Sequence, residues 1–469
     1  MKIQETFKKS SEKKIKRIEI TKDTLSSRGG LAMFVRYMES IKILNLIKNT
    51  IGSIYKNKKG KAIELVIAQI VAYFVDGSRK SIRGFDEAKE DSSLAAVLEI
   101  EQNELLSSDT VKRFFNKFVG VKYFLLRKVL LKLFIWRLSL TKPKVINLYL
   151  DTMVLDNDDA NTREGVTPTY KQVKGFQPLQ LSWMSFIVDA IFRSGKMHSN
   201  HGNDVQKMLK KVVTLIREEY SKDVPIIIRC DSGFMSESNF KLFEKELKVH
   251  YICSGKLYKS ITGYANNLGK ENFKKFEGNK NLWSYTEFGS KLDVWDNYRK
   301  TIYTTPHAEA NGQLFLSFAR PENVLYTNIG TIESLDEKLM ESGYGSYLET
   351  ENIIKLYHQN GESELVHRSF KEFALSEKLP FKHFHANAAY YYLMVIAHLL
   401  FQSYKEDVCS EIINIRSYPE TARRKLIDFS AKIVKTAHTV ILKVTEGIAK
   451  SIQIQTLWEK CNNPIPIAV

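Results

Sequence analysis

The spacing of apolar residues along the chain changes at about residue 139. Before that point, apolar residues recur three and four positions apart, as in LAMFVRYMESIKILNLI and KAIELVIAQIVAYFV, and this period predicts amphipathic helices. After it, continuous apolar runs such as KVINLYLDTMVL and VPIIIRCD alternate with amphipathic segments. Buried strands that alternate with helices indicate a mixed α/β sheet.

Other changes of pattern divide the remainder of the chain. The first 30 residues are polar and rich in lysine, which is typical of a flexible basic arm. Between residues 256 and 347, short alternating apolar runs are separated by turn residues, which predicts strands. The predicted order is a basic flexible arm (1–30), a helical domain (31–138), the first part of an α/β core (139–255), a β-rich insertion (256–347), the second part of the core (348–402) and a helical C-terminal region (403–469).

Charge and composition narrow the class of protein. The hydrophobic content of 43% and the charged content of 26% are those of a globular protein with an ample core. Lysine and arginine number 70 against 53 aspartate and glutamate residues, so the formal net charge is +17. This imbalance indicates a polyanionic partner, either nucleic acid or an anionic membrane surface.

Two further features bear on the compartment. The four cysteines show no CxxC spacing, so we expect reduced thiols, no structural zinc and a cytoplasmic location. The N-terminus is charged with no apolar stretch after it, unlike a secretory signal. The most apolar run, from Ala386 to Phe401, contains Asn387 and His398 and is short for a membrane span. We therefore predict a buried helix there and no membrane partner.

Three carboxylates are candidates for one site. Asp151 and Asp231 each end a predicted strand, where ligands of α/β sheets bind, and Glu364 lies on a predicted helix. Three converging carboxylates would form a site for two Mg²⁺ ions, with Mn²⁺ as an alternative. Asp156 competes with Asp151 for the metal, and Asp231 has the alternative role of capping a helix.

The helix that carries Glu364 supports this grouping. Read at about 100° per residue, Tyr357, Asn360, Glu364 and Lys371 fall within an arc of roughly 60°. A carboxylate, a lysine and a phenol would then project from the same side of one element.

Two other regions carry candidate contacts to nucleic acid. In the helical domain, LLSSDTVKRFFNKFV predicts a helix that bears Lys112, Arg113 and Lys117. Short helices of which the last is basic are compatible with a helix-turn-helix-like DNA-binding domain, although any small bundle with a basic face looks similar. In the insertion, Trp283 could stack on a base or belong to the core of a small β domain.

At these residues the chain resembles bacterial insertion-sequence transposases of the DDE class. Their signature is Tyr-x2-Arg-x3-Glu-x6-Lys, and here Tyr357, Glu364 and Lys371 match it while Asn360 stands in place of the arginine. The segments RCDSGFMS and LPFKHFHANAAYYYL also resemble that family. The resemblance covers about residues 140–402.

The resemblance implies an RNase H-like core with a β-rich insertion, and metal-dependent cleavage and strand transfer of DNA at the inverted-repeat ends of an insertion sequence. Asp151, Asp231 and Glu364 would be the catalytic metal ligands. The partners would be double-stranded DNA, at the inverted repeats and the target, and a second copy in a homodimeric synaptic complex. The place of action would be the bacterial cytoplasm, at the nucleoid.

Other residues of the signature would hold DNA. Tyr357 and Lys371 would contact phosphates of the strand that is cut. Asn360 lacks the charge of the family's arginine, and Arg368, one turn beyond Glu364, is placed to compensate for it. Asn360 also favours the alternative of a DNA-binding protein that descends from a transposase and has lost cutting. A third candidate is a nuclease without strand transfer.

Overall fold

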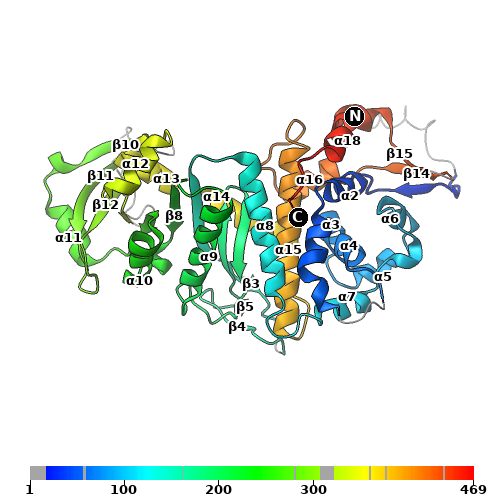
Figure 1. The fold of residues 1–469 in the computed structure, drawn as a ribbon, viewed down its shortest axis with the longest axis horizontal. Coiled ribbons are helices and arrows are strands. Elements are labelled where there is room, and N and C mark those ends of the chain that lie inside the picture. Colours follow the sequence, from blue (N-terminus) through cyan, green and yellow to red (C-terminus); the bar gives the residue numbers. More distant parts are fainter. Residues whose placement is uncertain are drawn as a thin grey trace, which may run out of the picture.

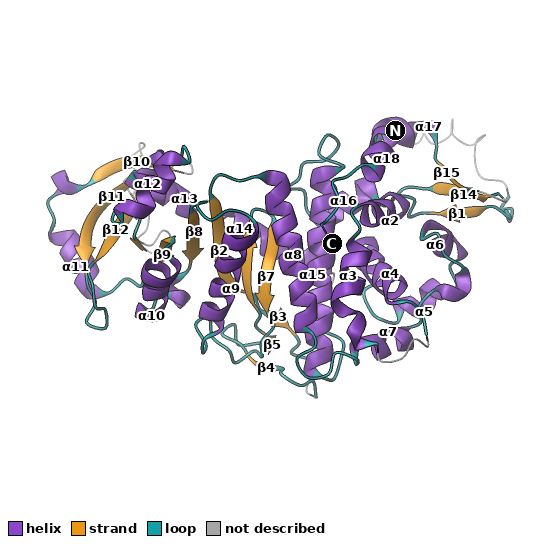
Figure 2. Cartoon of the chain, in the orientation of Figure 1, coloured by secondary structure: helices purple, strands orange, loops and turns teal. Residues whose placement is uncertain are grey.

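The computed structural model describes residues 17–55, 60–160, 162–278, 281–306, 322–358, 361–374, 378–436 and 439–468, without the side chains of residues 270, 278, 281, 282, 306 and 361–364. The long helix α15 (Phe384–Asp407) stands between two parts of the molecule. On one side of it lie most of the N-terminal helices, and on the other side lie the helix α8 (Phe124–Thr141) and a large sheet (Figure 1). Figure 2 shows that helices pack around the large sheet, and that a small sheet lies on the side of the N-terminal helices.

The large sheet has nine strands in the order β10-β11-β12-β13-β9-β8-β2-β6-β7. The neighbours β2, β8 and β9 run parallel, and the other pairs are antiparallel. Its strands are β2 (Ile146–Thr152), β6 (Leu179–Trp183), β7 (Phe186–Ile191), β8 (Ile226–Cys230), β9 (His250–Ser254), β10 (Lys274–Gly278), β11 (Asn281–Ser290), β12 (Arg299–Pro306) and β13 (Asn323–Thr327). The mixed α/β sheet predicted from the apolar runs is therefore present.

The strands expected as an insertion extend this same sheet. β13 pairs antiparallel with β9, with Tyr326 opposite Cys253, so β10 to β13 continue the core sheet beyond its parallel centre. The region also contains helices, α11 (Lys259–Asn267) and α12 (Glu333–Glu341). Pairing across such long sequence separations cannot be deduced from local alternation, which shows only that strands exist.

The region before the sheet is helical, as its periodicity predicted. Its helices are α2 (Gly30–Ser40), α3 (Ile43–Ile51), α4 (Ile63–Asp76), α5 (Gly84–Lys89), α6 (Ser92–Val97), α7 (Ser108–Phe115) and α8 (Phe124–Thr141). The helices that follow are α9 (Asp204–Glu219), α10 (Glu237–Lys241), α13 (Thr350–His358) and α14 (Gly361–Ala374). Residues 359 and 360, between α13 and α14, lie outside the described part.

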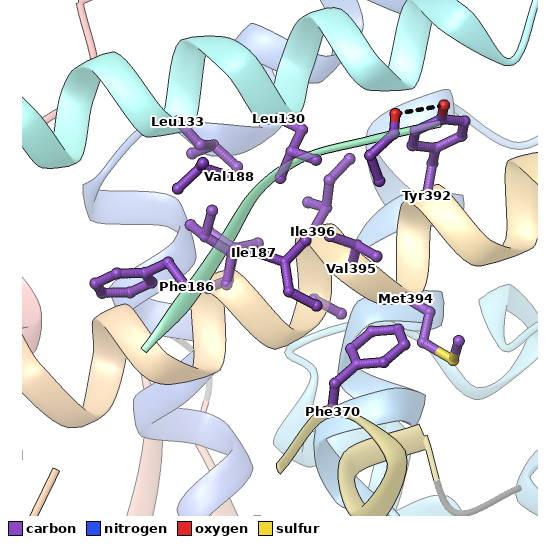
Figure 3. Packing of buried hydrophobic residues seen from close by; sticks show 14 of the residues in the cluster. Leu130, Leu133, Phe186, Ile187, Val188, Phe370, Tyr392, Met394, Val395 and Ile396 are labelled. Atoms are coloured by element: carbon purple, nitrogen blue, oxygen red, sulfur yellow. Dashed lines mark hydrogen bonds between the residues drawn. The ribbon is translucent and has the colours of Figure 1, made fainter. Parts of the chain in front are cut away.

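α15 is buried along most of its length, which confirms the buried helix predicted for Ala386–Phe401. Figure 3 shows its residues Val395 and Ile396 packed with Ile187 of β7, and the Tyr392 hydroxyl donating to the Ala190 carbonyl at 2.9 Å. Burying each large apolar side chain stabilises the fold by about 1.5–3 kcal/mol. Because α15 is buried between the sheet and the helical part, its apolar side chains hold the two together. No helix in the described part of the chain is long and apolar enough to cross a membrane.

The prediction of a wholly helical C-terminal region was wrong. After α16 (Pro419–Leu426), the chain forms β14 (Ala431–Lys435) and β15 (Val440–Lys443), and only then α17 (Glu446–Ser451) and α18 (Ile454–Asn462). β14 pairs with β1 (Thr24–Ser26), so three residues assigned to the flexible arm are also part of a sheet. A partner strand some 400 residues away decides between helix and strand here, because β structure depends on tertiary context.

Arg423 of α16 shows how firmly the C-terminal region is attached to the N-terminal helices. Its guanidinium donates to the carbonyls of Val75 at 2.9 Å and Phe74 at 2.7 Å, near the end of α4. These carbonyls have no partner within their own helix. α4 ends at Gly77 with φ at 63°, a conformation that favours glycine.

Candidate active site

Asp151 and Asp231 lie at the same edge of the sheet. β2 and β8 are parallel neighbours, and Leu150 is the register partner of Cys230. Asp151 follows Leu150 within β2, Asp231 directly follows the last residue of β8, and neighbouring strands are about 4.8 Å apart. Both carboxylates are partly buried. Strand-end reasoning alone predicted this convergence.

Asp231 stands where β8 gives way to the short helix η4 (Ser232–Phe234). Its Oδ1 accepts the backbone N–H of Gly233 at 2.8 Å, so the capping role considered from the sequence is real. Burial raises the pKa of Asp231, and the Gly233 N–H offsets only part of that rise. A carboxylate whose charge is disfavoured by burial would gain from a nearby cation.

Two of the contacts of the Asp151 carboxylate are described. The Thr152 N–H donates to Oδ1 at 2.6 Å, and the His367 Nδ1 lies 3.5 Å from Oδ2. Its competitor Asp156 lies on β3 (Leu155–Asp156), in a separate small sheet with β5 (Lys174–Phe176) and β4 (Thr167–Pro168). There the Asp156 Oδ1 accepts the Asp158 N–H at 2.9 Å, which is a local turn.

The end of α13 brings Tyr357 to this edge. Arg229 of β8 donates from its guanidinium to the Leu356 carbonyl, which holds the last turn of α13 against the strand. Burial raises the pKa of Tyr357 to about 12, a hydrogen bond with Ser254 lowers it, and the Asp231 charge contributes to the rise. Tyr357 is therefore within electrostatic reach of Asp231.

The structure describes only some of the other candidate DNA-contacting residues. Asn360 lies outside the described residues, and Glu364 is on α14 but its side chain is not described. Position 364 shares one face of α14 with His367 and Lys371, three and seven residues later. Arg368 is exposed, and its guanidinium lies 4.5 Å from the centre of the Tyr418 ring.

Sequence reasoning missed two residues near the carboxylates. His367 would have been found by extending the arc drawn through Glu364 and Lys371. Tyr170 lies at the tip of the β4–β5 hairpin and is 63% exposed. Partial burial raises its pKa, and the charges of Asp151 and Asp231 raise it further, so its phenol lies near both carboxylates. No periodic pattern marked this loop.

The basic residues of the helical domain lie on its surface. Lys112, Arg113 and Lys117 are all exposed. Lys112 pairs with Asp109 at 3.2 Å, and the Lys117 ammonium lies 4.2 Å from the centre of the Tyr55 ring. An exposed basic face of this kind is available to a polyanion.

The aromatic residues of the predicted insertion divide into two groups. Trp283 of β11 is partly buried, and its ring lies 5.9 Å from that of His358 at the end of α13. Trp295 is buried, and Arg299 is also buried and pairs with Glu237 at 2.8 Å. Trp295 and Arg299 therefore belong to the interior of the protein.

The donor atoms at the sheet edge suit a hard divalent cation. Asp151 and Asp231 offer carboxylate oxygens, the ligand type that Mg²⁺ prefers. Among the described side chains, no group of three or more His, Cys, Asp or Glu residues is arranged to hold a metal. The third expected ligand, Glu364, has no described side chain. The two aspartates thus fit part of a metal site.

Among comparisons with known proteins, one family model matches most of the chain. No curated protein sequence matches the chain. Among solved structures, it is similar to the piggyBac transposase synaptic complex with hairpin DNA, solved by cryo-EM, with a TM-score of 0.39, 12% identity, and coverage of 87% of this chain and 82% of that one. So remote a likeness transfers no residue role. The family model described as "Transposase DDE domain group 1" matches residues 7–463, nearly the whole chain. The chain belongs to this family of DDE transposases.

Proposed function

We propose that the protein cuts and joins DNA at the inverted-repeat ends of an insertion sequence, with Asp151, Asp231 and Glu364 as its catalytic residues and metal ligands. The observation that carries this proposal is the placement of Asp151 and Asp231 at adjacent positions on two parallel strands. We assign the sheet around β2 and β8 to an RNase H-like core, and α14 supplies the third carboxylate.

The carboxylates would hold two Mg²⁺ ions, or Mn²⁺. When bound, such ions activate a water or 3′-hydroxyl and stabilise the leaving oxygen of an in-line displacement. The chain's own part is to present its oxygens in fixed directions. The Thr152 N–H holds Asp151 and the Gly233 N–H holds Asp231, so neither carboxylate has to be ordered when a cation binds.

Residues around this edge would hold the DNA strand. Lys371 and Tyr357 would contact its phosphates, which positions the strand without reading its sequence. Arg368 would supply the cation that Asn360 lacks. Trp283, partly buried beside the end of α13, would stack on a base.

The N-terminal helices would bind the ends of the element. Lys112, Arg113 and Lys117 are exposed there, and the net charge of +17 favours any DNA surface. Because binding releases counterions, affinity should fall with salt with a log–log slope of about −0.9 for each phosphate neutralised. Two copies would bring two ends together in a homodimeric synaptic complex in the bacterial cytoplasm.

Asn360 keeps a second function open, a DNA-binding protein derived from a transposase that has lost cutting. The two functions differ in whether the protein uses its carboxylates to cleave DNA. Asn360→Arg restores the family's cation, and under the main proposal we expect it to leave cleavage unchanged or to raise it.

The deciding experiment measures Mg²⁺-dependent cleavage of a labelled duplex that carries the element's end. Asp151→Asn, Asp231→Asn and Glu364→Gln should each lower the cleavage rate by about a thousandfold or more, roughly 4 kcal/mol in the barrier, while end binding in a gel-shift assay survives. Asp156→Asn is the matched control and should cut like the parent. A Glu364→Gln variant that cuts as fast as the parent would refute the assignment.

A further inference from the structure

His367 is a described side chain of α14 that contacts the aspartate edge. Its Nδ1 lies 3.5 Å from the Asp151 Oδ2, a close polar contact that is longer than the usual N–H···O hydrogen bond of about 2.7–3.2 Å. Its side chain is only 17% exposed. This imidazole is therefore one contact between the helix and the end of β2.

The chemistry of this contact fixes the state of the imidazole. An ionised carboxylate only accepts hydrogen bonds, so the Nδ1 facing Asp151 must carry the proton. An Nδ1–H therefore faces Asp151.

A second histidine packed against the same helix shows what a purely structural role looks like. His398 of α15 is fully buried, and its Nε2 lies 3.1 Å from the Ser369 hydroxyl of α14. Ser369 and His367 are two residues apart, which turns them about 200° from each other around the helix. One face of α14 thus contacts the protein interior, while the face with His367 contacts a carboxylate at the sheet edge.

We propose that His367 is a positioning residue for the metal site. Its Nδ1–H, together with the Thr152 N–H, holds the Asp151 carboxylate in the direction that a divalent cation needs, and it ties the helix that carries Glu364 to β2. This inference rests on the proposed function. Hydrogen bonds to ligating carboxylates are worth about 10–100-fold in metal affinity.

The test uses the full chain and Mn²⁺ as the probe, with affinity measured by calorimetry and by the electron paramagnetic resonance of free Mn²⁺. His367→Leu keeps much of the volume but loses the N–H, so Mn²⁺ affinity should fall about 10–100-fold. His367→Asn places an amide N–H where Nδ1 stands and should recover affinity to within about threefold of the parent. His385→Ala, at the start of α15, is the matched control and should bind like the parent.

The outcomes separate this inference from the proposed function. If Asp151→Asn abolishes Mn²⁺ binding while His367→Leu binds like the parent, His367 does not position the site. If His367→Asn and His367→Leu lose affinity equally, the imidazole only packs, and the inference is wrong. If the parent binds no Mn²⁺, or Asp151→Asn binds it as the parent does, the metal site itself is wrong and the inference falls with it.

Discussion

Two aspartates of the same sheet have opposite surroundings. Asp189 of β7 is fully buried, and both its oxygens are held by Arg127 of α8, from Nε at 2.6 Å and from a terminal nitrogen at 2.5 Å. Asp231, at the end of β8, is partly exposed and accepts the Gly233 N–H. Among the described residues, no lysine or arginine is ion-paired with Asp231.

Burial raises the pKa of both carboxyls, but only Asp189 has a cationic side chain that counters the rise. Arg127 lowers the pKa of Asp189 back toward its usual range. In return, Asp189 raises the pKa of Arg127, although burial alone would lower it. A buried carboxylate that serves the fold is matched by a fixed cation. Asp231, at a strand end, has no such fixed cation among the described residues, so under the proposed function its lone pairs are available to a bound metal ion.

The largest expected effect is on the paired aspartate. Asp189→Ala leaves the Arg127 guanidinium buried without its partner, so the free energy of unfolding should fall by about 3–5 kcal/mol. Urea denaturation monitored by circular dichroism measures it. The double variant Arg127→Met, Asp189→Leu should recover most of the loss, because neither charge remains. A loss below about 1 kcal/mol for Asp189→Ala would mean that the pair is not a structural one.

A smaller effect should appear when a cation is added. A ligand that binds only the folded state stabilises it by about 2.7 kcal/mol at a hundred times its dissociation constant. Mn²⁺ should therefore raise the Tm of the parent and leave the Tm of Asp231→Asn unchanged in thermal denaturation. Equal shifts in both proteins would show that the ion binds elsewhere.

The smallest effect concerns pH. Burial raises the folded pKa of Asp231 above its unfolded value, near 3.9, so any stability from this group is present below pH 3.9 and lost as the pH rises through the folded pKa. Asn resembles the protonated form and keeps the Gly233 contact. Without metal, Asp231→Asn should unfold a few degrees higher than the parent at pH 7, and at the same temperature as the parent near pH 3. A lower Tm for Asp231→Asn at pH 7 would contradict this account.

Much of the aspartate edge followed from local pattern. Continuous apolar runs marked β2 and β8 as strands covered on both faces, and each run ended on an aspartate. His367 could have been found in the same way, from its place on the helix face with Lys371. Tyr170 could not, because a hairpin tip has no periodicity and its approach to the aspartates depends on how the small sheet folds back.

The sequence by itself determined the class of fold, the helical N-terminal region and the two strand ends, because helix and strand periods and buried apolar runs are local properties. Only the tertiary structure decided that β10 to β13 extend the core sheet and that Ala431–Lys435 is a strand. It also decided that Asp189 pairs with the guanidinium of Arg127 and that Asp151 lies beside the imidazole of His367. The physical reason is that strand pairing and charge pairing join residues far apart in the chain, and their free energy depends on burial and on partners that no local window contains.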